Sequence, residues 1–362
     1  MWNPDGFMEM LYEQSVTARK GLSSRSNSER KALLKERLQS SLGSYEDMRA
    51  PLNPILLERI EYEDYIRERI EIGTVIGLRM PIYILIPKTE VRVVQSGQLP
   101  GMLALHGHGY GSREVIGLAS DGTMLTKKGG HNSFAMELMR QGHIVVAPEM
   151  IGLGDRRLLR DTIPGKERSS CISLTGQLLM YGMSLGGLRV FEALRALDYF
   201  VTRTEVAADQ IGCMGFSGGG TVAAYASALD ERIKATVLCA FTNTFKGSIL
   251  SINHCIDNFV PGVLDYAELP DLIGLIAPRP LFIESGENDP IFPASSLQEA
   301  IEILQGIYCQ EQAEDMLQYD IFPGVHEVNG REIYPWLRSI WRSGISHYPG
   351  NDLNMIEEAK AE

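Results

Sequence analysis

The sequence predicts an α/β fold with a largely parallel sheet, on the strength of three observations. Helix-type and strand-type hydrophobic patterns alternate along most of the chain, which is typical of repeated β-α-β crossovers. Several strands, such as His143–Ala147, are short and almost wholly apolar, as in sheets that are covered on both faces. A Gly-x-Ser-x-Gly motif lies between one strand and the helix that follows it.

The same patterns divide the chain into three parts. Residues 1–69 are interpreted as an N-terminal helical extension, with helices near Phe7–Arg19 and Ser28–Leu42. Residues 70–347 form the α/β domain, and residues 348–362 form a C-terminal tail. Strands are expected in that domain at Ile70–Leu78, Pro81–Pro87, Met102–Leu105, His143–Ala147, Gln210–Met214, Ile233–Ala240, Leu281–Glu284 and Leu317–Phe322. Helices are expected there at Leu185–Phe200, Thr221–Ala228, Ser295–Ile307 and Glu332–Arg342.

Two longer segments, residues 152–173 and 242–269, interrupt the alternation after strand ends. A doubly wound sheet places its ligand crevice beyond the carboxyl ends of its strands. We therefore expect both segments to form walls of a pocket, with His254 and Trp336 as candidate substrate-binding residues.

Composition narrows the class of partner. The 362 residues include 46 acidic and 34 basic side chains, a net charge of −12, which disfavours nucleic acid and anionic membrane surfaces as partners. The N-terminus lacks a basic start followed by an apolar run, and the five cysteines form no paired framework. These features predict a cytoplasmic protein with free thiols.

Ser217 is the candidate nucleophile. It lies in Gly215-Phe-Ser217-Gly-Gly219, directly after a strand and before a helix. On so tight a turn, only small residues two positions before and after leave room for the serine, whose hydroxyl then stands at a helix N-terminus. The alternative, a phosphate-binding loop, is disfavoured because the turn lacks the Lys-Ser/Thr ending and the Gly-x-Gly-x-x-Gly pattern.

A serine hydroxyl needs a base to take its proton and a carboxylate to orient that base. His326 follows the strand Leu317–Phe322 and is the expected base. Asp289, in the polar turn after an earlier strand, is the expected acid, with Glu284 and Glu287 as competitors in the same segment. The chain order of serine, acid and histidine is the one expected when the serine lies on a strand-turn-helix elbow.

Acyl transfer also needs two N–H donors for the oxyanion. Gly218 is expected to supply one, and His108, in the glycine-rich loop after Met102–Leu105, the other. A metal held by His106 and His108 is disfavoured, because no carboxylate or cysteine cluster lies near them in the chain. No metal and no cofactor are therefore expected.

From about Ile70 to Arg342 the chain resembles the α/β-hydrolase superfamily, and more narrowly its dienelactone-hydrolase-like and acetyl-xylan-esterase-like branch. The motifs that carry the resemblance are His106-Gly107-His108-Gly109, Gly215-Phe-Ser217-Gly-Gly219, Ala277-Pro-Arg-Pro280 leading into Gly286-Glu-Asn-Asp289, and His326-Glu327. The resemblance implies an eight-stranded, mostly parallel sheet and a serine carboxylic-ester hydrolase that needs no cofactor. Two positions depart from the branch: Gly218 stands where the acetyl xylan esterases carry Gln, and Ser217 where dienelactone hydrolases use Cys.

The function expected from these residues is hydrolysis of a small ester through an acyl-enzyme, with a short-chain ester or an acetylated sugar as substrate. The alternatives are a thioesterase or peptidase with the same triad, or a non-catalytic relative that binds a ligand. The non-catalytic class is disfavoured because no triad member is missing. For the N-terminal extension, two roles stay open: capping the pocket, or assembling a homo-oligomer.

Overall fold

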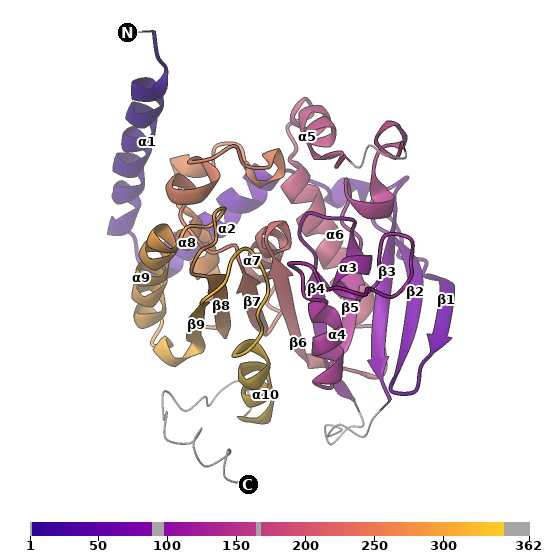
Figure 1. Cartoon of the computed structure of the whole chain (residues 1–362). Coiled ribbons are helices and arrows are strands. Elements are labelled where there is room, and N and C mark those ends of the chain that lie inside the picture. The colour runs from indigo at the N-terminus through magenta and orange to yellow at the C-terminus, as the bar shows by residue number, and fades with distance from the viewer. Residues whose placement is uncertain (1, 89–97, 164–167, 344–362) are drawn as a thin grey trace.

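A computed structural model of the chain describes residues 2–88, 98–163 and 168–343 (Figure 1). The strands are β1 Ile55–Glu61, β2 Tyr65–Gly73, β3 Arg79–Pro87, β4 Leu99–Leu105, β5 Ile144–Pro148, β6 Val206–Phe216, β7 Ala235–Cys239, β8 Leu281–Gly286 and β9 Leu317–Phe322. The α-helices are α1 Asp5–Lys20, α2 Asn27–Leu42, α3 Ser112–Val115, α4 Phe134–Arg140, α5 Cys171–Leu179, α6 Leu185–Phe200, α7 Gly218–Leu229, α8 Leu269–Ile273, α9 Ala294–Gln310 and α10 Ile333–Ser343. The predicted tail, residues 348–362, lies outside the described residues.

In the described part of the chain the strands form one sheet in the order β1-β2-β3-β5-β4-β6-β7-β8-β9. The pairs from β5 through β9 are parallel, while β1, β2 and β3 run antiparallel to their neighbours. The mostly parallel α/β architecture is therefore confirmed, and seven of the predicted strands correspond to β3 through β9. The first, predicted at Ile70–Leu78, overlaps β2 only at residues 70–73, because β2 begins earlier, at Tyr65. The ninth strand, β1, is an edge strand that falls in the segment interpreted as helical. Its apolar residues Ile55, Leu56 and Leu57 are consecutive and exposed, so the alternation of apolar and polar residues that marks a half-buried strand is missing.

Alternation of side chains along the central strands builds two hydrophobic layers. Leu103 and Leu105 of β4 point into one layer, while Met102 and Ala104 point into the other. Helices α2, α6, α7, α8 and α9 contribute to the first layer, and α4 and α10 to the second. Both faces of the central part of the sheet are thus covered, which is why central strands such as β5 and β7 are almost wholly apolar.

The two predicted N-terminal helices are confirmed as α1 and α2. Helix α2 begins with a capping box between Ser26 and Glu29 and buries three leucines at helical spacing against the first layer. Helix α1 extends along one edge of the molecule and beyond its body (Figure 1). Its Tyr12 hydroxyl donates to Glu268, 3.0 Å away, so α1 is attached to the 242–269 segment. The two roles proposed for the extension stay predictions.

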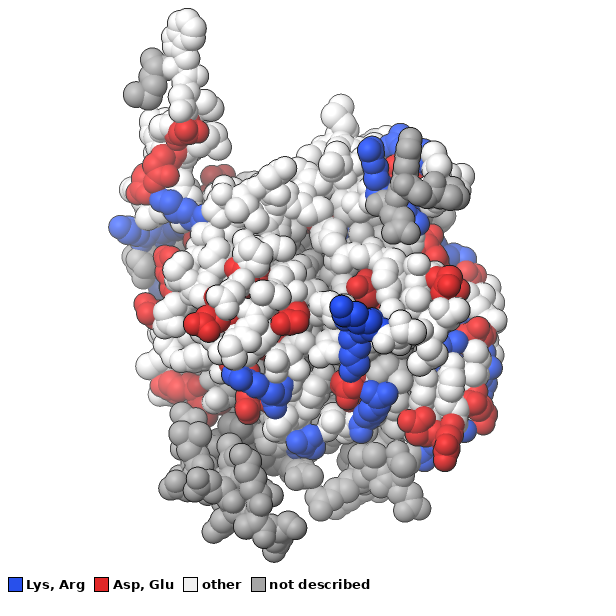
Figure 2. All heavy atoms as spheres, in the orientation of Figure 1, with Lys and Arg blue, Asp and Glu red and all other residues white. Residues whose placement is uncertain are grey.

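The loops that carry the candidate residues leave the carboxyl ends of β4, β6, β8 and β9, at one edge of the sheet. At β4 the order of strands along the sheet reverses, because β5 lies on one side of β4 and β6 on the other. In open α/β sheets this is the place where a crevice forms. Acidic and basic side chains are interspersed over the face that Figure 2 shows. None of the described helices is both long and apolar enough to cross a membrane.

Candidate active site

Ser217 lies on the tight turn between β6 and α7, with φ at +54° and ψ at −121°. This conformation is costly for a residue with a side chain, so the surrounding backbone must hold it in place. The flanking glycines allow the neighbouring backbone to pack closely around the turn. A Cβ on Gly215 would stand 2.2 Å from the carbonyl oxygen of Gly219, and one on Gly219 would stand 2.0 Å from that of Leu105. The turn has the strained geometry of a nucleophile elbow.

His326 and Asp289 meet at the carboxyl ends of β9 and β8. Nδ1 of His326 lies 2.8 Å from Oδ2 of Asp289. The other carboxylate oxygen, Oδ1, accepts the backbone N–H groups of Ile291 at 2.8 Å and Phe292 at 3.1 Å. The Asp289 side chain is fully buried, so its orientation is fixed by these bonds. An acceptor at Nδ1 keeps the proton on that nitrogen and leaves Nε2 free to accept another.

The two competing carboxylates lie elsewhere. Glu287 is exposed to solvent. Glu284 is buried at the end of β8, where it accepts the N–H groups of Asn329 at 2.9 Å and Gly330 at 2.6 Å. Burial raises the pKa of Glu284 to about 7. Of the three candidates, Asp289 is the one that hydrogen-bonds His326, while Glu284 hydrogen-bonds the loop that follows His326.

The imidazole of His326 is placed by aromatic packing. It lies 4.9 Å, centroid to centroid, from the ring of Phe216, the residue before Ser217. On another side it stacks on Phe292 at 5.8 Å and 14°. No hydrogen bond joins Ser217 to His326 in the described part of the chain; in unliganded sites such bonds are often long and tighten with substrate. The packing nevertheless brings the ring to the elbow.

The two candidate oxyanion donors belong to segments that lie against each other. A Cβ on Gly218 would stand 3.2 Å from the imidazole ring of His108, so the loop after β4 lies against the start of α7. Within the described residues, neither the Gly218 N–H nor the His108 N–H donates a backbone hydrogen bond. Both groups are therefore free to bind an anionic oxygen.

Two further histidines hold the loop that carries His108. Nε2 of His131 accepts the Gly107 N–H at 2.9 Å, and Nε2 of His106 accepts the Met150 N–H at 3.0 Å. Burial lowers the pKa of His106 to about 3, so its ring is neutral and can accept this bond. Nothing in the sequence points to this role of His131, because its hydrogen bond with Gly107 joins two loops that lie 24 residues apart in the chain.

The two proposed substrate-binding residues have different surroundings. His254 packs edge-on against Phe292, at 5.4 Å, and Phe292 in turn stacks on His326, so His254 lies beside the candidate triad. Burial lowers the pKa of His254. Trp336 does not pack with His254, Phe292 and His326. It lies on α10 in the second hydrophobic layer, against Phe282 of β8, where its indole fills the core beneath the sheet.

A strained elbow at the switch point of such a sheet, with an acid and a histidine after later strands, defines an α/β hydrolase. The chain belongs to the abhydrolase family Abhydrolase_7, which matches residues 27–306. It is 30% identical to the curated Bacillus subtilis (strain 168) protein "Putative hydrolase YtaP", over 76% of this chain and 86% of that one.

Solved structures agree on the fold. A "putative acetyl xylan esterase" from Bacteroides fragilis NCTC 9343 has a TM-score of 0.66 at 17% identity, over 84% of this chain and 87% of its own. Methylesterase BT1017 has a TM-score of 0.63 at 18% identity, over 92% of this chain and 72% of its own. The α/β-hydrolase fold and the resemblance to esterases of this superfamily are thus confirmed. The chain is a member of a hydrolase family.

Proposed function

We propose that this protein is a serine carboxylic-ester hydrolase that acts on a small ester through an acyl-enzyme. The observation that carries the proposal is the Asp289–His326 pair at 2.8 Å, placed beside the strained elbow that presents Ser217. A strained serine, a buried carboxylate and an imidazole, which follow one another along the chain in that order, favour acyl transfer.

The first half of the reaction forms an ester to the enzyme. Nε2 of His326 takes the proton of the Ser217 hydroxyl while Oγ attacks the ester carbonyl carbon. The negative charge that develops on the carbonyl oxygen is bound by the N–H groups of Gly218 and His108. When the tetrahedral intermediate collapses, the C–O bond to the alcohol breaks, and the alcohol leaves with the proton from His326.

The second half releases the acid. Water gives a proton to His326 and attacks the acyl-enzyme, and the same N–H groups bind the second oxyanion. Ser217 leaves with its proton restored. Throughout, Asp289 accepts the Nδ1–H of His326 and stabilises the imidazolium form of the ring. The protein's own residues supply every group in this scheme.

Short-chain esters, including acetylated sugars, are the proposed substrates. The names of the structural neighbours, an acetyl xylan esterase and a methylesterase, support a small acyl or alcohol group. His254 is retained as a substrate-binding candidate, since it lies beside Phe292 and His326, and Trp336 is set aside because it is buried in the core. The five free cysteines suit a reducing compartment, and the cytoplasm is the proposed location.

The test combines a fluorophosphonate probe with turnover of p-nitrophenyl acetate. We expect the parent to be labelled once and to hydrolyse the ester, and Ser217→Ala to lose both properties. Ser40→Ala is the matched control, because Ser40 is an exposed serine on α2 far from the elbow in the sequence. Absence of labelling and turnover in the parent would contradict the proposal. Turnover of a thioester or a peptide p-nitroanilide in place of simple esters would favour the alternative acyl donors.

A further inference from the structure

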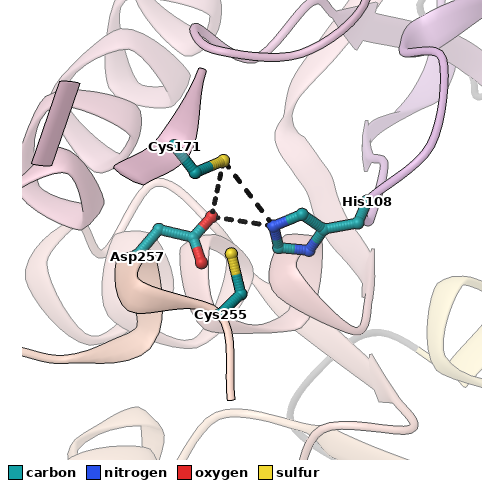
Figure 3. A group of neighbouring side chains, drawn as sticks. All are labelled: His108, Cys171, Cys255 and Asp257. Carbon is teal, nitrogen blue, oxygen red and sulfur yellow. Dashed lines mark hydrogen bonds and ion pairs between the residues drawn. The ribbon is translucent and has the colours of Figure 1, made fainter. Parts of the chain in front are cut away.

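Four side chains of metal-ligand type meet at the glycine-rich loop after β4, residues 106–111, which is named the oxyanion loop for its proposed role. His108 comes from the loop after β4, Cys171 from the start of α5, and Cys255 and Asp257 from the 242–269 segment. Their ligand atoms all lie within 4.8 Å of one another. Figure 3 shows the four side chains pointing toward one centre from different parts of the chain.

The distances between these atoms resemble the edges of a coordination tetrahedron. Nε2 of His108 lies 3.1 Å from Oδ2 of Asp257 and 3.8 Å from Sγ of Cys171, and that Sγ lies 3.5 Å from Oδ2. Ligand atoms bonded tetrahedrally to Zn²⁺ at about 2.0 to 2.3 Å stand about 3.3 to 3.8 Å apart. His108, Cys171 and Asp257 thus have close to the spacing that such an ion requires, and Sγ of Cys255 lies within 4.8 Å of each of their ligand atoms.

We propose that His108, Cys171, Cys255 and Asp257 bind one Zn²⁺ ion. Two thiolates with an imidazole and a carboxylate form a donor set that favours zinc over the hard cations Mg²⁺ and Ca²⁺. Four protein ligands fill a tetrahedral shell and leave no open position for water or substrate, which is typical of structural sites. Cys171 and Asp257 are buried, so the ion is largely shielded from solvent.

Arg189 supports the arrangement from outside the ligand set. Its guanidinium donates to Asp257 and, at 3.2 Å, to Sγ of Cys171, and it also donates to the carbonyl of Ile151. Groups that hydrogen-bond metal ligands in this way orient them. The charges balance: Zn²⁺ and the guanidinium supply three positive charges, and two thiolates and one carboxylate supply three negative ones.

The surroundings of His108 already favour a cation. Nε2 of His108 faces the buried carboxylate of Asp257 and the sulfur of Cys171. A metal ion would bind at this nitrogen in place of any proton there, because an imidazole ligand must be neutral. A bound ion would join the oxyanion loop to residues 152–173 and 242–269, the two segments expected to form the pocket walls. The ion would hold His108 in position and would take no part in the acyl-transfer steps.

Metal analysis of the full-length protein tests the proposal independently of esterase activity. Protein purified in zinc-supplemented buffer and then desalted should contain about one Zn²⁺ per chain, as measured by inductively coupled plasma mass spectrometry. Protein stripped with a chelator and loaded with Co²⁺ should show thiolate-to-Co²⁺ charge transfer and the intense visible bands of tetrahedral Co²⁺. The double variant Cys171→Ser, Cys255→Ser should lose the zinc and the spectrum.

Cys309→Ser is the matched control, since Cys309 is an exposed thiol on α9 outside the cluster; it should keep both signals. If the double variant fails to fold, the zinc content and Co²⁺ spectrum of the parent still decide the matter. Parent protein that retains no stoichiometric zinc and shows no thiolate–Co²⁺ band would overturn the proposal. So would a Cys171–Cys255 disulfide in the freshly isolated parent, detected by non-reducing peptide mapping.

Discussion

Replacing Glu284 with Gln should change how the stability of this protein depends on pH. The Glu284 side chain is 1% exposed, and it accepts the N–H groups of Asn329 and Gly330 in the loop after His326. These hydrogen bonds favour the ionised form, but burial disfavours it more strongly and raises the pKa from 4.5 to about 7. Between pH 4.5 and about 7, the folded protein therefore holds a proton on Glu284 that the unfolded chain has already released.

The size and sign of the effect follow from that difference. A shift of about 2.5 pKa units corresponds to about 3 kcal/mol of stability. Because the folded-state pKa is raised, this contribution is complete below pH 4.5 and is lost as the pH rises through about 7. Gln has no proton to lose, so the free energy of unfolding of Glu284→Gln, relative to the parent, should rise by about 3 kcal/mol across that window.

Urea denaturation at a series of pH values between about 4.5 and 8 measures this quantity directly. Glu287→Gln is the control: Glu287 lies three residues further on and is exposed, so that variant should follow the parent at every pH. A constant difference between Glu284→Gln and the parent across the series would refute the reasoning. It would mean that Glu284 ionises alike in the folded and unfolded states.

Two further substitutions test the candidate site. Asp289→Asn should lower kcat for p-nitrophenyl acetate on the order of 10⁴-fold with little change in the midpoint of unfolding, because the amide no longer holds the reactive tautomer of His326; activity within tenfold of the parent would show that another group orients the ring. Gly219→Ala places a Cβ 2.0 Å from the carbonyl oxygen of Leu105, so the elbow must shift, and we expect the free energy of unfolding in urea to fall by about 1 to 3 kcal/mol. An unchanged denaturation curve for that variant would show that the turn is looser than its geometry indicates.

The elbow and the histidine could be located from the sequence because each depends on local context. Ser217 stands between a strand and a helix that the sequence itself predicts, and the glycines around it are required by contacts at the turn. His326 and Asp289 follow later strands in the order that the fold dictates. In a parallel sheet, the ends of different strands meet at one edge, so a correct list of strands already places these loops together.

Features that depend on distant contacts could not be found in this way. Strand β1 is exposed along almost its whole length, and its apolar residues Ile55, Leu56 and Leu57 are consecutive, so it lacks the alternating pattern by which half-buried strands are recognised. His131 supports the oxyanion loop from 24 residues away, and Trp336 is buried by packing on Phe282 of another element. None of these relations leaves a periodic pattern in the chain, because each depends on which loops and helices the fold brings together.

The two histidines of the oxyanion loop show how surroundings decide what a side chain can do. His106 and His108 are two residues apart on one glycine-rich loop and are indistinguishable as sequence signals. His106 is enclosed by backbone groups, and burial keeps it neutral, so it serves as a hydrogen-bond acceptor for Met150. His108 instead faces Asp257, which lies 3.1 Å from its Nε2 and belongs with it to the proposed zinc site. The sequence argues against metal at this loop because the carboxylate and the two cysteines lie 63 or more residues away; the fold removes that objection by bringing them to His108.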